Sequence, residues 1–365
     1  MLGRPDPLLD RARNSGELID RPRKLIDRLG GDGMDVLSDV LLAVRLTGAI
    51  FFDVEARSPF AAETPAVEAI AQRVMAGAGH VISFHIVTEG VCWAEGIGLP
   101  DRPVHLRAGE IVVYPMGDPN VLASAPGMRG MPDETLYYHP ADRLLPFPLK
   151  VNQDSGADTC RFVCGFLGCD SRPFNPLLNA LPRIVHAPVS SLSRGWLASI
   201  VDAAVKESAH GSAGREAMLA KLAELMFVEV MRNHIDSLPN DARGWFAGLR
   251  DPQIGAALRL IHGRPSESWT LDSLAREIGL SRSSFAERFT TFVQIPPMQY
   301  LGRWRLQIAA RLLEASTVSI AQAAAEVGYQ SEAAFNRAFK RYASLAPGAW
   351  RRKRKGSAAP TPGVA

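Results

Sequence analysis

Cysteine and long apolar stretches are scarce in this chain. Only four of its 365 residues are cysteines, which excludes the dense disulfide framework of small secreted domains. No stretch approaches the roughly 18 apolar residues of a membrane-spanning helix. Residues 1–33 intersperse Arg, Asp and Glu where a secretory signal needs an apolar core. We therefore expect a cytoplasmic protein with no membrane partner, in which residues 1–33 form a flexible extension.

The four cysteines also lack a recognised metal-binding or redox pattern. Cys160, Cys164 and Cys169 are spaced C-x3-C-x4-C, whereas zinc knuckles and redox motifs use C-x2-C. Cys92 stands apart, and no histidine lies at a paired spacing nearby. We interpret all four as buried free thiols, with a redox or metal sensor as the alternative. No metal or other cofactor is expected.

Charge is unevenly distributed along the chain. Residues 251–365 carry 16 Lys and Arg against 8 Asp and Glu, a net charge of +8. The whole chain has 41 and 38, so the first 250 residues hold 25 and 30, a net charge of −5. Such asymmetry points to a polyanionic partner for the C-terminal third.

The pattern of apolar residues predicts a mixed N-terminal region followed by helices. A short helical period covers residues 35–47, and residues 49–169 consist of short β-rich runs separated by Gly, Pro and Asp, which predicts an antiparallel sandwich or barrel. Residues 214–235 place Leu219, Leu222, Met226 and Val230 on one helical stripe. This stripe packs either on its own domain or across a homodimer. Residues 241–251 have the composition of a linker.

Two similar segments between residues 252 and 350 predict a repeated helix-turn-helix. Thr270 and Ser281 are candidate N-caps of two short helices in the first unit, and Ser319 and Ser331 are the corresponding candidates in the second. A Gly ends the first helix of each unit. A short helix, a Gly-containing turn and a second helix form the motif that places its second helix in the major groove of DNA.

The second helix of each unit has a predicted buried face and a predicted DNA-facing side. The i,i+4 pairs Phe285/Phe289 and Phe335/Phe339 face the core. The opposite side is then exposed, and small residues there allow close approach to DNA while Arg, Asn and Ser can hydrogen-bond bases or phosphates. These exposed residues are Arg282, Ser283, Ala286 and Glu287 in the first unit, and Glu332, Ala333, Asn336 and Arg337 in the second.

A helix of about 20 residues is predicted between the two units. Its length of about 30 Å is close to the ~34 Å turn of B-DNA, so it could place both recognition helices in successive major grooves. Arg303 and Arg305 on this helix would be free to contact phosphates. The basic run at 351–356 is interpreted as a flexible phosphate-binding tail, or as a solubilising one.

Residues 252–352 resemble the DNA-binding domain of the AraC/XylS family of bacterial transcription regulators. The resemblance rests on LAREIGLSRSSFAERF, on PPMQYLGRWRLQIAARLL and on IAQAAAEVGYQSEAAFNRAFKRYASLAPGAWR. It implies base or phosphate contacts from Glu332, Asn336 and Arg337. The first unit departs from the family pattern because Glu287 stands where members usually carry Arg. The full set expected to contact DNA is Arg282, Ser283, Ser284, Ala286, Glu287, Arg288, Arg303, Arg305, Gln330, Ser331, Glu332, Ala333, Asn336, Arg337 and Lys340.

Residues 35–185 look like the cupin-type effector domain found in a branch of this family. The resemblance rests on the FHIVTEG strand, on LRAGEIVVYPMGDPNVLAS and on the CGFLGCD…NPLLNALP stretch. Asn120 stands where a metal-binding cupin has His, and His85 lacks an H-x-H partner, so no metal and no catalytic residue is expected. Strand alternation suggests either Phe84 or His85, together with Trp93, Tyr114 and Asn120, as residues that line an effector pocket.

These observations predict a two-domain α+β protein, with a cupin-like β-barrel bearing accessory helices and an all-α double helix-turn-helix domain. It is expected to be a non-enzymatic, homodimeric regulator that binds double-stranded promoter DNA and a small-molecule effector, and RNA polymerase if it is an activator. A cupin enzyme fused to a DNA-binding module and a non-specific architectural DNA-binding protein are the alternatives. The expected segments are an extension (1–33), the effector domain (34–185), a helical dimerisation or connector region (186–240), a linker (241–251), the DNA-binding domain (252–352) and a flexible basic tail (353–365).

Overall fold

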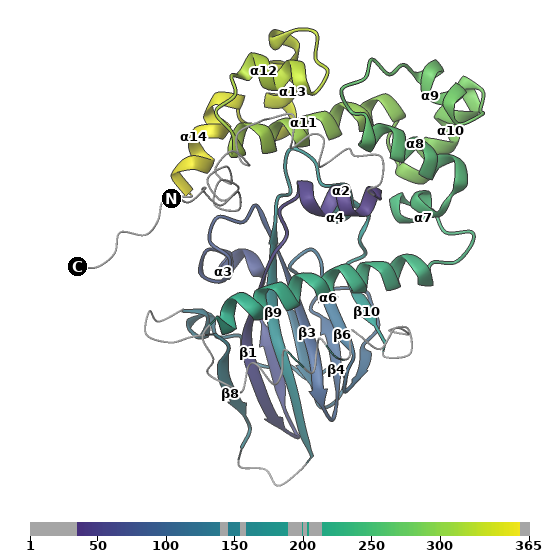
Figure 1. Ribbon diagram of the computed structural model, residues 1–365. Helices are drawn as coiled ribbons and strands as arrows, with labels where there is room; N and C mark the ends of the chain where they lie inside the picture. The colour runs from purple at the N-terminus through teal and green to yellow at the C-terminus, as the bar shows by residue number, and fades with distance from the viewer. Residues whose placement is uncertain are drawn as a thin grey trace, which may run out of the picture.

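The computed structural model describes residues 35–138, 145–153, 158–188 and 214–357, together with residues 199 and 203. Two sheets form the N-terminal part, and helices from residue 245 onward form the C-terminal part (Figure 1). The predicted extension at 1–33, much of the predicted connector region and the last residues of the tail lie outside the described residues.

The N-terminal domain contains a six-stranded and a four-stranded sheet. All pairings are antiparallel except β1 with β8. The larger sheet has the order β10 (Val185–Ala187), β6 (Ile111–Tyr114), β3 (His80–Glu89), β9 (Thr159–Cys169), β1 (Thr47–Arg57), β8 (Phe147–Val151). The smaller has the order β2 (Ala61–Thr64), β7 (Asn120–Ala123), β4 (Val91–Gly96), β5 (Val104–Arg107).

Of the predicted alternatives, sandwich and barrel, the sandwich is observed, since no strand pairing joins the two sheets into a closed barrel within the described residues. Large side chains fill the space between them, including the mutually contacting rings of Phe51, Phe52, Tyr137 and Phe166. Two sheets held apart by such a core pack face to face as a sandwich. The short helices α3 (Val67–Val74) and η2 (Glu134–Tyr137) accompany the sheets.

The larger sheet buries both of its faces. Along β3, Ile82, Phe84 and Ile86 belong to a core shared with helices, while Val81 and Val87 belong to the core between the sheets. Helix α6 (Arg215–Ser237) lies across the outer face of this sheet (Figure 1). It approaches β1 so closely that a Cβ at Gly48 would meet the Ala220 carbonyl oxygen at 2.7 Å.

The apolar stripe of α6 therefore packs on its own domain. Leu219, Met226 and Val230 are at most 1% exposed. Met218 and Leu225 point away from the sheet and keep 50% and 47% of their surface exposed. Of the two packings considered for this stripe, the one on its own domain is thus observed.

The C-terminal domain is entirely helical. The predicted linker at 241–251 contains helix α7, because Trp245 and Phe246 are buried in the core and the Trp245 indole donates to the Tyr300 hydroxyl at 2.9 Å. The predicted flexible tail begins as part of helix α14. The helices are α7 (Trp245–Arg250), α8 (Pro252–Gly263), α9 (Leu271–Glu277), α10 (Arg282–Val293), α11 (Pro297–Ala315), α12 (Ile320–Glu326), α13 (Glu332–Ala343) and α14 (Pro347–Ser357).

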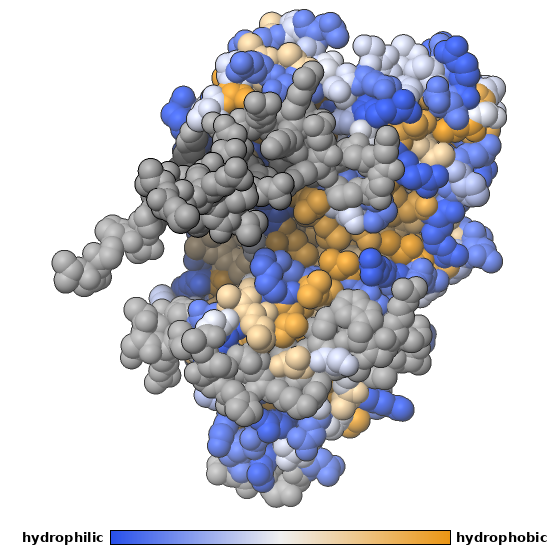
Figure 2. Space-filling view, viewed as in Figure 1, coloured by the Kyte–Doolittle hydropathy of each residue, from blue (hydrophilic) through white to orange (hydrophobic). Residues whose placement is uncertain are grey.

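One continuous apolar core joins the two domains. Helices α2 (Val36–Ala43) and α4 (Pro176–Ala180) pack on the C-terminal helices, α2 against α8 and α11 and α4 against α7. Figure 2 shows apolar side chains gathered in the band between the domains. At its centre the buried Gln307 amide donates to the Ala43 carbonyl and accepts from the Phe174 backbone N–H, both at 3.0 Å.

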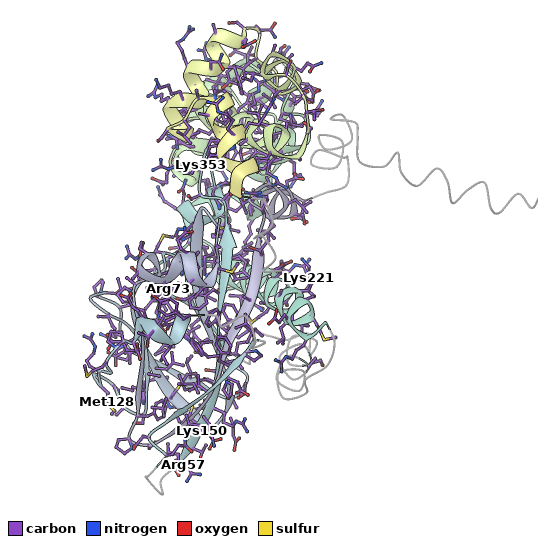
Figure 3. All side chains as sticks on the ribbon, turned by 90° about the vertical axis from the view of Figure 1, so that its left-hand side faces the viewer. Arg57, Arg73, Met128, Lys150, Lys221 and Lys353 are labelled. Atoms are coloured by element: carbon purple, nitrogen blue, oxygen red, sulfur yellow. The ribbon has the colours of Figure 1, made fainter. Side chains whose placement is uncertain are left out.

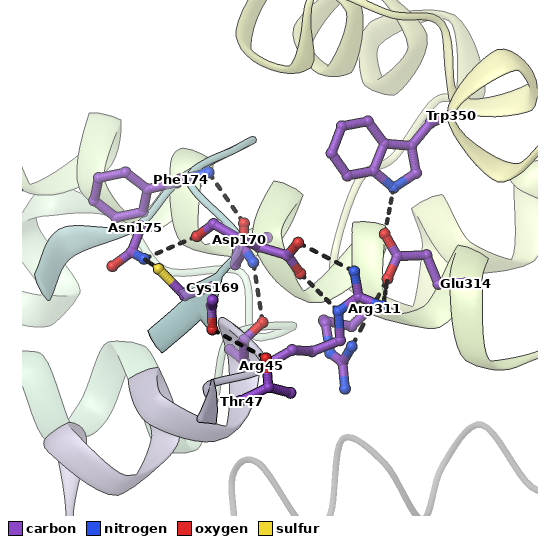
Figure 4. A network of polar contacts seen from close by, with 12 residues as sticks. Arg45, Thr47, Cys169, Asp170, Phe174, Asn175, Arg311, Glu314 and Trp350 are labelled. Carbon is purple, nitrogen blue, oxygen red and sulfur yellow. Dashed lines mark hydrogen bonds and ion pairs between the residues drawn. The ribbon is translucent and has the colours of Figure 1, made fainter. Parts of the chain in front are cut away.

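A polar network lies beside this core (Figure 4). The Arg45 guanidinium donates to both carboxylate oxygens of Asp170 at 2.8 and 3.1 Å and is 3.2 Å from the Glu314 carboxylate. Glu314 also accepts from the Trp350 indole at 2.9 Å. The network therefore connects β9 and the segment after α2 with α11 and α14.

We expect Gly165→Ala to destabilise the sandwich. A Cβ at this position in β9 would lie 2.3 Å from the Phe84 ring and 2.5 Å from the Ala49 carbonyl oxygen. Relieving such contacts costs about 1–3 kcal/mol, which urea denaturation would show as a lower midpoint. Gly302→Ala in α11 is the matched control, since its Cβ meets nothing within 4 Å and a helix gains up to about 1 kcal/mol. An unchanged midpoint for Gly165→Ala would contradict this account.

Candidate nucleic-acid interface

Each helix-turn-helix unit begins its helices with the predicted caps. The Ser281 and Ser331 hydroxyls accept from the backbone N–H of Ser284 and Ala334, each at 3.2 Å. Ser319 forms a reciprocal capping box with Gln322, at 2.8 and 3.0 Å. Such bonds satisfy N–H groups that the start of a helix otherwise leaves without partners. The caps thus define where both recognition helices, α10 and α13, begin.

The paired phenylalanines face the core as predicted. Phe285 and Phe289 have ring centroids 5.6 Å apart, Phe335 and Phe339 5.5 Å apart, and all four side chains are fully buried. The opposite faces of α10 and α13 are consequently open to solvent. The predicted contact residues that lie exposed are Arg282, Ser283, Ser284, Glu287, Arg288, Gln330, Ser331, Glu332, Ala333, Arg337 and Lys340, while Ala286 and Asn336 are half-buried.

The turn of the second unit is one residue longer and is more tightly held than the first. Gly279 and Gly328 both have positive φ, of +70° and +84°, a conformation that costs glycine little. A Cβ at Gly328 would also lie 2.6 Å from the Ser266 carbonyl oxygen, whereas one at Gly279 would meet nothing within 4 Å. Tyr329 in this turn packs its ring on Phe335 at a centroid distance of 5.4 Å.

Helix α11 connects the two units. Its 19 residues correspond to about 28 Å, and the units lie toward its two ends, on the side of the molecule away from the sheets (Figure 1). The arrangement therefore presents two exposed recognition helices separated by a rigid helical spacer.

The prediction that Arg303 and Arg305 are free for phosphates is wrong. Arg305 donates to the carbonyl oxygens of Pro265 at 2.7 Å, Glu267 at 2.6 Å and Gly328 at 3.4 Å. Arg303 stacks over the rings of Phe174 and Tyr342, with centroid distances of 5.8 and 5.1 Å. Arg305 therefore holds loops of the C-terminal domain, whereas Arg303 packs between α13 and the segment after β9.

The two recognition helices differ in their available positive charge. In the first unit, Arg288 forms an ion pair with Asp251 at 2.5 Å, and Arg282 lies 3.8 Å from Asp272. In the second unit, Arg337 and Lys340 are exposed and have no ion pair among the described residues. Positive charge without an acidic neighbour is therefore more available on α13 than on α10.

The predicted effector residues do not all meet. Phe84 faces the helix-covered side of the larger sheet, and Trp93 lies on the outer side of the smaller sheet against His105. Of the alternatives Phe84 and His85, His85 is therefore the one that lies between the sheets. The predicted place of Trp93 is wrong, because its side chain lies on the opposite side of β4 from buried Cys92 and Ala94. His85, Tyr114 and Asn120 do come together between the sheets.

These three residues form a buried polar cluster. The His85 ring nitrogens lie 2.8 Å from Asn120 Oδ1 and 3.0 Å from Cys164 Sγ, while Asn120 donates to Ser83 Oγ at 3.3 Å. The Tyr114 hydroxyl is buried and has no hydrogen-bond partner among the described residues. Burial lowers the pKa of His85 to about 4 and raises the pKa of Tyr114. The cluster is therefore uncharged at neutral pH and ties β3 of one sheet to β7 of the other.

The cysteines are buried free thiols, as interpreted from the sequence. Within the described residues, no group of three or more His, Cys, Asp or Glu is placed to hold a metal ion, and no helix is long and apolar enough to span a membrane.

Comparison with known proteins places both domains. Residues 35–236 match the Cupin family and residues 274–353 match a helix-turn-helix domain family. A putative AraC-like transcription regulator of Streptomyces lividans is 32% identical over 75% of this chain and 88% of its own length. The transcriptional regulator AlkR of Acinetobacter baylyi is 38% identical over 49% and 59%. A crystal structure of an AraC-type transcriptional regulator from Chromobacterium violaceum is 25% identical and covers 30% of this chain and 96% of its own, with a TM-score of 0.28.

These matches define a DNA-binding transcription regulator built from a cupin-type domain and a helix-turn-helix domain. The chain belongs to the AraC-like family of transcription regulators.

We expect the buried His85 to make stability depend on pH. Its folded pKa of about 4 lies below the ordinary value near 6.5, so the unfolded chain binds more protons between these values and stability falls as pH falls. The slope is about 1.4 kcal/mol per pH unit for this one group. Denaturation midpoints between pH 7 and pH 4.5 should fall less steeply for His85→Gln. Equal slopes in the two proteins would refute the assignment.

Proposed function

We propose that the N-terminal domain of this regulator senses a small molecule and thereby changes how the helix-turn-helix domain binds promoter DNA. The observation that carries this proposal is the continuous core between the domains, in which Gln307 of α11 bonds backbone groups of Ala43 and Phe174. A ligand that favours one arrangement of this junction would shift the positions of both recognition helices, because α11 holds both. Promoter DNA lies in the bacterial cytoplasm, where we propose that the protein works without catalytic activity.

The proposed effector site within the N-terminal domain is the cluster of His85, Tyr114 and Asn120. The Tyr114 hydroxyl supports it, because a buried donor without a partner is costly, and a ligand hydroxyl or carbonyl would satisfy it. A neutral polar ligand suits this place, since His85 is uncharged at neutral pH and burying an unpaired charge is expensive.

The proposed DNA contacts are the exposed residues of α10 and α13, and Asn336 and Arg337 are proposed to make the main contacts to bases. Amide and guanidinium groups recognise adenine and guanine edges through paired hydrogen bonds. In the first unit Glu287 accepts from cytosine but repels phosphate. If the protein is an activator, RNA polymerase is a further partner.

The paired substitution Asn336→Ala with Arg337→Ala tests this role. Each lost base contact costs about 1–3 kcal/mol, so affinity for a duplex that the wild-type protein selects from a random pool should fall about 10²-fold or more. Gel-shift titration at fixed salt measures this.

Arg232→Ala is the matched control, since it removes one exposed positive charge on α6 and should leave that affinity unchanged. Unchanged affinity of the double variant for the selected duplex would contradict the proposed role of α13 in base recognition. Equal affinity of the wild-type protein for any duplex would instead favour an architectural protein.

We also propose a homodimer formed through the outward face of α6. Met218 and Leu225 support this, because they lie seven residues apart on one helix face and stay 50% and 47% exposed. A two-fold dimer also matches symmetric operator sites.

Leu225→Glu should convert the dimer to a monomer in sedimentation equilibrium, since a carboxylate at a dry interface loses its hydration. Leu136→Glu introduces the same charge at another exposed leucine, in η2 (40% exposed), and should leave the mass unchanged. A wild-type mass of one chain, or a dimer that survives Leu225→Glu, would contradict the proposal.

A further inference from the structure

A groove runs between the two domains, beside the network of Arg45, Asp170 and Glu314. It consists of two adjoining cavities of about 460 and 690 Å³ that share Gly77 and Ala78 in their walls. These volumes fall in the range of roughly 300–1,000 Å³ typical of small-molecule sites. The larger cavity is bounded by the α3–β3 connection and the end of β9 on one side, and by α13 and α14 on the other.

The charge of the larger cavity is positive and comes from both domains. Among the described residues that line it, the charged ones are Arg172, after β9, and Lys353, on α14. Both are exposed, and neither has an ion pair among the described residues. Figure 3 shows Lys353 at the junction of the domains. Arg172 donates to the Ser344 hydroxyl at 2.8 Å, which uses one of its five N–H donors.

Among the described residues that line the smaller cavity, no charged side chain is comparably free. Its cation, Arg45, is already paired with Asp170 and Glu314, and Asp170 itself lines that cavity. An anion is therefore attracted to the Arg172 and Lys353 end of the groove rather than to the Arg45 end.

Apart from Gln72, the other described residues that line the larger cavity are apolar or small. Trp350 and Leu345 provide an aromatic and an aliphatic surface, and the opposite wall includes Gly77, Ala78 and Gly79. Small side chains on one wall leave room for a flat ring system against the other. The groove thus joins a cationic end with an apolar surface.

We propose that this groove binds an amphipathic organic carboxylate, with the carboxylate between Arg172 and Lys353 and the apolar body against Trp350 and Leu345. Arginine suits a carboxylate because its planar fork matches the two oxygens. A ligand held in this way contacts both domains at once and favours the arrangement in which the two cations are close. This inference deepens the proposed sensing function and adds a site distinct from the neutral cluster at His85.

The test is calorimetric titration of the full chain with 2-naphthoate and with uncharged 2-naphthalenemethanol, at one ionic strength. Naphthoate should bind at one site per chain. The alcohol should bind at least roughly tenfold more weakly than naphthoate. Arg172→Gln and Lys353→Gln should each weaken naphthoate binding roughly tenfold, without changing binding of the alcohol. Lys221→Gln, a 73% exposed side chain on α6, is the matched control and should leave both unchanged.

Ser344→Gly separates ligand binding from a contact between domains. It removes the hydroxyl that accepts from Arg172, and Ser344 has a φ of +61°, which glycine adopts without strain. Naphthoate affinity should be retained in this variant. A loss equal to that of Arg172→Gln would overturn the proposal, because Arg172 would then act only as a domain contact.

Three other results would overturn it: no naphthoate binding, equal binding of naphthoate and the alcohol, or full naphthoate affinity in Lys353→Gln with weakened operator binding. The last result would mean that Lys353 of α14 contacts DNA and not the carboxylate. Because the titration contains no DNA, failure of this inference is distinguishable from failure of the DNA-binding role, which the Asn336 and Arg337 variant tests.

Discussion

The buried amide of Gln307 imposes the constraint on which the arrangement of this protein depends. A buried backbone N–H or carbonyl without a partner is costly, and Gln307 satisfies one of each, on Phe174 and on Ala43. Both bonds are made only when α11 lies in one place against the N-terminal domain. Because α11 connects the two helix-turn-helix units, the same amide determines where both recognition helices sit relative to the sheets.

The charged groups at this junction are arranged so that the buried part is neutral. Burial raises the pKa of Asp39 to about 7 and lowers that of His262 to about 3, with 3.9 Å between Asp39 Oδ2 and His262 Nδ1. Between pH 4 and 6.5 the folded pair holds one proton, on Asp39. The unfolded pair also holds one, on the histidine, so the pair adds little pH dependence to stability in that range. The uncompensated charge of the junction is confined to its solvent-exposed groove.

Local chemistry made much of the C-terminal domain predictable from sequence. The caps at Ser281 and Ser331 and the phenylalanine pairs are set by residues within one turn of each other. Features set by distant segments were not predictable. Strand alternation left Phe84 and His85 as alternatives on β3 and assigned Trp93 to the wrong side of β4, because distant segments determine which face of each strand meets the core. Arg305 resembled a free surface arginine because its partners, Pro265 and Glu267, lie about 40 residues away in the sequence. Residues 241–251 have the composition of a linker, but the buried aromatic pair of α7 makes part of this segment a helix.

The asymmetry between the two units follows from the same packing. The longer second turn is held by Arg305 and by the close approach of Gly328 to Ser266, whereas no atom lies within 4 Å of a Cβ at Gly279. A rigidly held recognition helix loses less conformational freedom on binding and positions its side chains more accurately. The available cations Arg337 and Lys340 lie on this helix, while Arg282 and Arg288 of the first unit have acidic neighbours. The unit whose turn is held more tightly thus also carries the cations that have no ion pair among the described residues, and α11 connects it rigidly to the first unit, with Glu287.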